Sequence, residues 1–165
     1  MKRIICMVLC LMLLAACVGC QKEGQPGGNS IAFYYPNAQL SYQASSAAIT
    51  PEYRTFHQWE NWAQVLNIYL GGPETMGYDT PFPAGLRVVK TVMENDTVYV
   101  TVSQELTSLT GLELTIACSC LAMTTLELTG AKTVVLRATD GLLGGQKSMT
   151  MDKNTLLLLD TAQEE

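Results

Sequence analysis

Cys17 lies at the end of a short apolar run near the amino terminus. The run extends from Ile4 to Leu14, follows Lys2 and Arg3, and leads into the motif Leu14-Ala15-Ala16-Cys17. Eleven apolar residues are too few to cross about 30 Å of hydrocarbon as a helix, so the run is typical of a signal peptide. The two alanines suit a signal peptidase, and the motif resembles the lipobox at which a bacterial lipoprotein receives a diacylglyceryl group. We predict lipid attachment to the thiol of Cys17.

Two alternatives to this site remain open. The segment can be an ordinary secretory signal in which Cys17 only coincides with the cleavage junction. Cys20, preceded by Cys17-Val18-Gly19, offers a second lipobox-like site, but it lacks the leading leucine. The motif before Cys17 therefore makes the better attachment site.

Cleavage before Cys17 divides the chain into a signal peptide (1–16), a tether (17–30) and one domain (31–160). The tether is rich in glycine and polar residues, which is typical of a flexible spacer. Loss of Lys2 and Arg3 changes the formal net charge from −5 to −7. Phosphate backbones and anionic lipid surfaces repel such a domain, so we predict no nucleic-acid binding. Membrane attachment must come from the acyl chains, which would hold the protein on the outer face of the bacterial cytoplasmic membrane.

The other reactive side chains form no catalytic motif. His57 is the single histidine, and it is predicted on the polar face of a helix, exposed to solvent. Cys118 and Cys120 are two residues apart on a predicted helix, so their side chains point to nearly opposite sides. Small core residues are the better interpretation of both cysteines than a disulfide, a metal site or a nucleophile. We predict no catalytic residue, no metal and no cofactor.

The aromatic residues suggest one docking point. Tyr78 and Phe82 lie beside prolines in a loop, where exposed aromatic side chains often bind partners. Phe56 and Trp59, in contrast, are predicted at core positions of a helix. We therefore expect Tyr78 and Phe82 to be exposed and to form the candidate docking loop.

Local patterns predict the elements that position these residues. Thr50-Pro51-Glu52 is typical of a helix start, and an apolar rhythm follows as far as Leu70, before Gly71-Gly72-Pro73 ends the helix. Thr110 and Glu113 form a capping-box pattern at the start of a second helix, which is apolar on nearly every side and ends at Gly130. The predicted strands are 31–36, a short one within 40–49, 86–93, 97–102, 132–138 and 155–159.

Helices that alternate with hairpins favour an α+β domain over a doubly wound sheet. We predict a single small domain in which an antiparallel or mixed sheet carries both helices on one face.

The order of these features resembles the sporulation and spore-germination domain family known as GerMN. The matching pieces follow the lipobox and tether in sequence order: FYYP at 33–36, YLGGP at 69–73, PFPAG at 81–85, the strand leading to Val102-Ser103, the helix through Ala122, Thr124 and Thr125, and the strand 132–136. The resemblance covers about residues 31–140 and implies a fold related to the ring-building motifs of sporulation assemblies.

The resemblance implies binding or assembly and carries over no catalytic residue. The predicted function is a non-catalytic, lipid-anchored extracytoplasmic module that acts through protein contacts or envelope assembly, in sporulation or spore germination. The alternative is a module that binds a cell-wall glycan or peptide through the loop from Tyr78 to Phe82. The partners are therefore the membrane, through the lipid, and a protein or a wall component; no oligomeric state follows.

Overall fold

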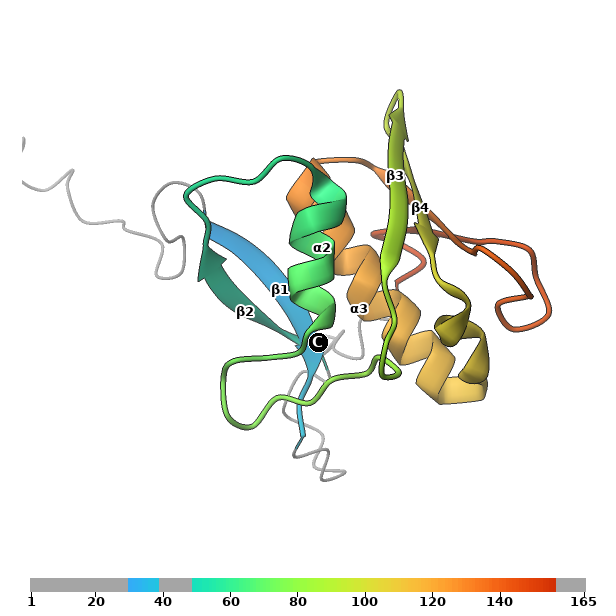
Figure 1. Ribbon diagram of the computed structural model, residues 1–165, viewed down its shortest axis with the longest axis horizontal. Helices are drawn as coiled ribbons and strands as arrows, with labels where there is room; N and C mark the ends of the chain where they lie inside the picture. The colour runs from blue at the N-terminus through green and yellow to red at the C-terminus, as the bar shows by residue number, and fades with distance from the viewer. Residues whose placement is uncertain (1–29, 39–48, 157–165) are drawn as a thin grey trace, which may run out of the picture.

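The computed structural model describes residues 30–38 and 49–156 (Figure 1). The signal peptide, Cys17, Cys20, the tether up to residue 29, and most of the short strand predicted within 40–49 lie outside this part. The elements follow in the order β1 (Ser30–Pro36), β2 (Ile49–Thr55), α2 (Trp62–Leu70), β3 (Val88–Glu94), β4 (Thr97–Val102), the 3₁₀ helix η1 (Gln104–Ser108), α3 (Gly111–Thr129), β5 (Thr133–Ala138) and β6 (Met149–Asp152).

Two sheets enclose the helices. β1 and β2 pair antiparallel, while the second sheet has the order β3-β4-β5-β6, with β4 and β5 parallel and the outer pairs antiparallel. Figure 1 shows α2 and α3 between the β1–β2 pair on one side and β3 and β4 on the other. The predicted α+β class, with both helices on one face of a mixed sheet, is confirmed, and the β1–β2 pair covers the far side of α3.

This position explains why α3 has no polar face. Every residue from Ala117 to Ala122 is buried, because β1 lies against one side of the helix and β5 and β6 against the other. The backbone N–H of Tyr34 in β1 donates to the hydroxyl of Thr124 at 3.0 Å. Gly130 ends the helix with a φ of 69°, a left-handed conformation that glycine adopts without steric cost.

The four-stranded sheet has one buried face. Val98, Val100 and Val102 are fully buried, as are Val134 and Leu136 on the parallel neighbour. This confirms the predicted apolar face of the second hairpin strand. Asn95, in the predicted turn of this hairpin, has a φ of 54°, which asparagine tolerates better than most residues.

The predicted helix over residues 50–70 is wrong in its first half. Residues Ile49–Thr55 form β2 and pair with the whole of β1, so that Pro51 lies opposite Tyr34. The helix begins only at Trp62, where the Asn61 side chain accepts a hydrogen bond from the Gln64 N–H at 3.0 Å. β2 is an edge strand of this pair, and an edge strand tolerates a proline because its outer side needs no backbone donor.

Two further local predictions need correction. The helix α3 starts at Gly111 as expected, but the Thr110 side chain makes no capping hydrogen bond. The last strand is Met149–Asp152, which pairs with β5, whereas Thr155 lies in the turn that follows. Residues 157–159 of the strand predicted there lie outside the described part.

Candidate functional site

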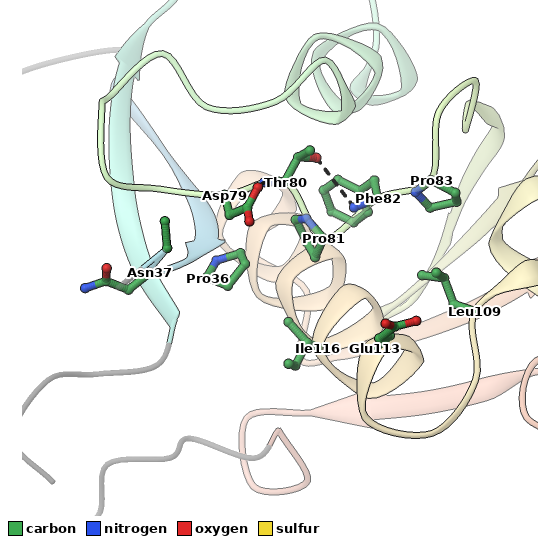
Figure 2. Close-up of a pocket in the computed structure, with 11 residues that line it drawn as sticks. Pro36, Asn37, Asp79, Thr80, Pro81, Phe82, Pro83, Leu109, Glu113 and Ile116 are labelled. Atoms are coloured by element: carbon green, nitrogen blue, oxygen red, sulfur yellow. Dashed lines mark hydrogen bonds between the residues drawn. The ribbon is translucent and has the colours of Figure 1, made fainter. Parts of the chain in front are cut away.

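A groove of about 420 Å³ opens between three segments that are distant in sequence. The end of β1 with the two residues after it forms one wall, the loop 79–83 forms the second, and the start of α3 with Leu109, two residues before the helix, forms the third. Figure 2 shows the carboxylates of Asp79 and Glu113 and the apolar side chains around this groove. The lining residues are Pro36, Asn37, Ala38, Asp79, Thr80, Pro81, Phe82, Pro83, Leu109, Glu113 and Ile116.

Backbone hydrogen bonds hold the loop against β1. The N–H of Asp79 donates to the carbonyl of Pro36 at 3.0 Å, and the N–H of Ala38 donates to the carbonyl of Gly77 at 2.9 Å. Within the loop, the Asp79 carboxylate accepts from the N–H of Thr80 at 2.8 Å. These bonds fix two of the three groove walls, the end of β1 and the loop, to each other.

The buried ring of Phe82 anchors the same loop to the core. It is only 8% exposed, and its centroid lies 5.2 Å from that of Tyr69 on α2, edge to face. Tyr69 is itself fully buried, and its hydroxyl donates to the carbonyl of Tyr34 at 2.6 Å. Burial raises the pKa of the Tyr69 hydroxyl well above its usual value, so this group serves as a neutral donor.

The predicted exposure of the docking pair is therefore wrong. Phe82 belongs to the core and contributes to the groove floor, while Tyr78 is half-buried and packs against the core beside the groove. The proline-flanked loop does line the groove, but the sequence pattern does not reveal which way its rings point. The role of this loop in docking stays a prediction.

A buried ion pair supports the loop that leads into the groove. Glu52 on β2 is 6% exposed, and its carboxylate accepts from Arg54 Nε at 2.6 Å. The same carboxylate accepts from the backbone N–H groups of Glu74 and Thr75 at 3.0 and 2.7 Å. Arg54 also donates to the carbonyl of Gly72 at 2.7 Å. This cluster ties the end of α2 and residues 72–75 to the β1–β2 sheet.

Hydrogen bonding outweighs burial at Glu52. Burial alone would raise the pKa of this carboxyl, but the hydrogen bonds from Thr75 and Arg54 hold its pKa below the usual value. The Arg54 guanidinium also lies 5.0 Å from the centroid of Phe33, over its ring. The ion pair between Glu52 and Arg54 was not predicted from the sequence, because residues 50–55 were predicted as helix. On a strand, residues two apart such as Glu52 and Arg54 lie on one face.

The remaining candidate residues lie apart from the groove. Cys118 and Cys120 are free and fully buried in α3, as predicted. Burial raises the pKa of the Cys118 thiol to about 12 and also raises that of Cys120. His57 is exposed as predicted, but it lies in the segment between β2 and α2 instead of on a helix. Trp59, in the same segment, is 38% exposed instead of being core.

Within residues 30–38 and 49–156, no cluster of three or more His, Cys, Asp or Glu side chains has a metal-binding arrangement. By length and composition, α3 could cross a membrane. A buried core helix meets the same criteria, and α3 is packed between two sheets.

The fold defines a small α+β domain with two helices between two sheets. Residues 32–141 match the Germane family, described as sporulation and spore germination, and the chain belongs to this family.

The chain is similar to solved structures at low sequence identity. The tandem GerMN domains of the sporulation protein GerM from Bacillus subtilis match with a TM-score of 0.50 and 15% identity, over 72% of this chain and 43% of that one. This chain thus spans less than half the length of that protein. A candidate lipoprotein from Clostridium perfringens matches with a TM-score of 0.45 and 14% identity, over 76% and 87% of the two chains. No curated protein matches.

Proposed function

We propose that this chain is a non-catalytic module, anchored by a lipid on Cys17 to the outer face of the cytoplasmic membrane, that acts through protein contacts in sporulation or spore germination. The observation that carries the proposal is the family match, which extends from β1 to just beyond β5 and so includes nearly all of the described domain. The lipobox before Cys17 supplies the anchor.

The placement of the reactive groups supports binding over catalysis. The two thiols of α3 are buried with raised pKa values, so they stay protonated and unreactive at neutral pH. The Glu52 carboxylate is engaged by Arg54 and by backbone N–H groups of the neighbouring loop. The described part of the domain offers a partner a groove with acidic and apolar walls.

The anchor is tested by expression of the full chain with its own signal in a Gram-positive host. Wild-type protein should partition into the detergent phase, with an intact mass that fits a diacylglyceryl group on Cys17. Cys17→Ser should release the domain or leave an unprocessed precursor, whereas the matched control Cys20→Ser should behave like wild type. A mature protein that begins at Cys20 would contradict the assignment.

The mode of action is tested by two parallel assays on the full chain. Affinity capture from solubilised membranes measures protein contacts, and co-sedimentation with purified peptidoglycan measures wall binding. We expect capture of a partner protein that persists after the cell wall has been digested. We also expect no hydrolysis of peptidoglycan, ester or peptide substrates, with or without divalent metal. Sedimentation with peptidoglycan in the absence of protein capture would favour the wall-binding alternative, and reproducible turnover would refute the non-catalytic role.

A further inference from the structure

The charged residues that line the groove are all acidic. Asp79 and Glu113 are both exposed and lie on different walls, one on the loop and one on the first turn of α3. Among the residues that line the groove, none is lysine, arginine or histidine. A ligand that places a positive charge between these carboxylates would therefore meet attraction from two sides and repulsion from neither.

The rest of the lining is apolar and stiff. Pro36, Pro81 and Pro83 come from two walls, and each fixes its own backbone φ. Leu109 and Ile116 complete the apolar surface on the side of α3. Because backbone bonds already hold the β1 wall and the loop together, and the third wall is the start of a helix, a ligand would not have to order these walls on binding.

The lining favours a peptide over a sugar as the occupant. Sugar-binding sites usually offer an exposed aromatic face, but the Phe82 ring is packed against Tyr69 and is only 8% exposed. Proline and aliphatic side chains instead suit the apolar side chains of an extended peptide, which also brings lysine or arginine within reach of the rim. A volume of about 420 Å³ lies in the range of ordinary ligand pockets.

We propose that this groove binds an extended segment of a partner protein in which a lysine or arginine stands next to a proline or an aliphatic residue. The cation lies between Asp79 and Glu113, and the apolar neighbour lies against Pro81, Leu109 and Ile116. The inference rests on the proposed function, since it names the surface and the partner chemistry of a module that works by protein contact.

Three short fluorescent peptides of equal length test the proposal on the full chain carrying Cys17→Ser, which is free of lipid. The first has lysine between proline and leucine, the second has glutamate in place of the lysine, and the third has lysine between serines. Fluorescence anisotropy should detect binding of the first peptide only, and the binding should weaken as ionic strength rises.

Variants of Asp79 and Glu113, the two acidic residues at the rim of the groove, show whether the peptide binds there. Asp79→Asn with Glu113→Gln should weaken the first peptide about three- to thirtyfold, as expected for the loss of two exposed charge pairs. Asparagine at position 79 keeps an oxygen for the Thr80 N–H, so the loop should stay folded. The matched control, Glu94→Gln with Asp140→Asn, removes the same charge from exposed positions outside the groove and should change affinity little. Glu113→Lys should weaken the first peptide further, because its lysine would then meet a like charge on one wall.

Equal loss of affinity in the rim and control variants would overturn the groove as the site, because only net charge would then matter. Binding of soluble muropeptides at this groove, with no binding of the basic peptide, would overturn the protein occupant. If membrane capture of a partner persists undiminished in the rim variant, the inference fails while the proposed function stands. If capture is absent from wild type as well, the proposed function itself fails.

Discussion

Glu52→Gln is the substitution that tests most sharply how the groove is positioned. The Glu52 carboxylate accepts three hydrogen bonds, one from Arg54 and two from the backbone N–H groups of residues 74 and 75. The amide of glutamine can replace one acceptor oxygen but places an NH₂ group where the second oxygen stood. The Arg54 guanidinium would then be left nearly buried beside a neutral partner.

The expected cost follows from the geometry of this pair. Removal of one partner from a buried ion pair costs about 3–5 kcal/mol. Arg54 keeps its hydrogen bond to the Gly72 carbonyl, so we expect the lower end, about 3 kcal/mol. For a domain of this size such a loss lowers the Tm by about 10 °C. Adding Arg54→Met should recover part of the stability, because it removes a nearly buried charge whose remaining ion pair, with the exposed Glu74 at 3.4 Å, is weak.

The effect should depend on pH in a defined direction. Because the pKa of Glu52 in the folded protein lies below its usual value of 4.5, the folded state favours the ionised carboxylate. The contribution of this carboxylate to the free energy of unfolding is fully present above the pKa that Glu52 has in the unfolded chain. It is lost as the pH falls through the pKa that Glu52 has in the folded protein. Urea denaturation should therefore show the largest difference between wild type and Glu52→Gln near neutral pH, and a shrinking difference in acid.

The control for this experiment is Glu127→Gln, which neutralises an exposed carboxylate on α3 and should change stability by less than about 0.5 kcal/mol. Hydrogen exchange of residues 72–78 gives a second readout, since the loop should open more readily in Glu52→Gln alone. A loss no larger than that of the control, with unchanged exchange in this loop, would refute the argument that the ion pair fixes the groove wall.

Three further predictions concern the core. Cys118 and Cys120 should resist thiol reagents in the native state and react after denaturation, as followed by mass spectrometry; rapid native labelling would contradict their burial. Ala122→Leu should overpack the space around α3 and cost about 1–3 kcal/mol in urea denaturation. Phe82→Ala should cost about 3–5 kcal/mol, because this ring is core; an unchanged Tm would show that it is instead a surface residue.

Elements with strong local signals could be predicted from the sequence. The β-branched and aromatic run of β1, the hairpin around Asn95 and the apolar helix ending at Gly130 all lie where the sequence predicts them. Each signal depends on residues within one element, so no knowledge of tertiary pairing was needed. The burial of most of α3, including every residue from Ala117 to Ala122, follows from the same pattern.

The error at residues 50–55 has a tertiary cause. Thr50-Pro51-Glu52 suits a helix start, yet pairing with β1 and burial of Glu52 against Arg54 stabilise an extended strand. The pairing joins two strands that are separated by residues 37–48, and no local pattern reports it. The true helix start at Asn61 carries an ordinary capping residue that the longer pattern concealed.

The groove could not be predicted from the sequence for the same reason, because its walls come from segments that are distant along the chain. Prolines and aromatic residues mark the loop 78–83 in the sequence, but the pattern around Glu113 indicates a capping box and not a groove wall. The two regions come together because α3 packs beneath β1, whose last residue, Pro36, binds the loop through its carbonyl. The burial of Phe82 also depends on Tyr69, which belongs to another element.

Site-specific photo-crosslinking of the full, lipid-anchored chain in its native host tests the central claim most directly. A photoreactive amino acid at Ile116 reports on the groove, and one at Val135, on the sheet strand β5, serves as the control. We predict that Ile116 crosslinks to a protein segment with an adjacent basic and apolar residue, and that Asp79→Asn with Glu113→Gln reduces this product. Crosslinks from Ile116 only to wall fragments, or equal products from both positions, would contradict a protein-binding groove.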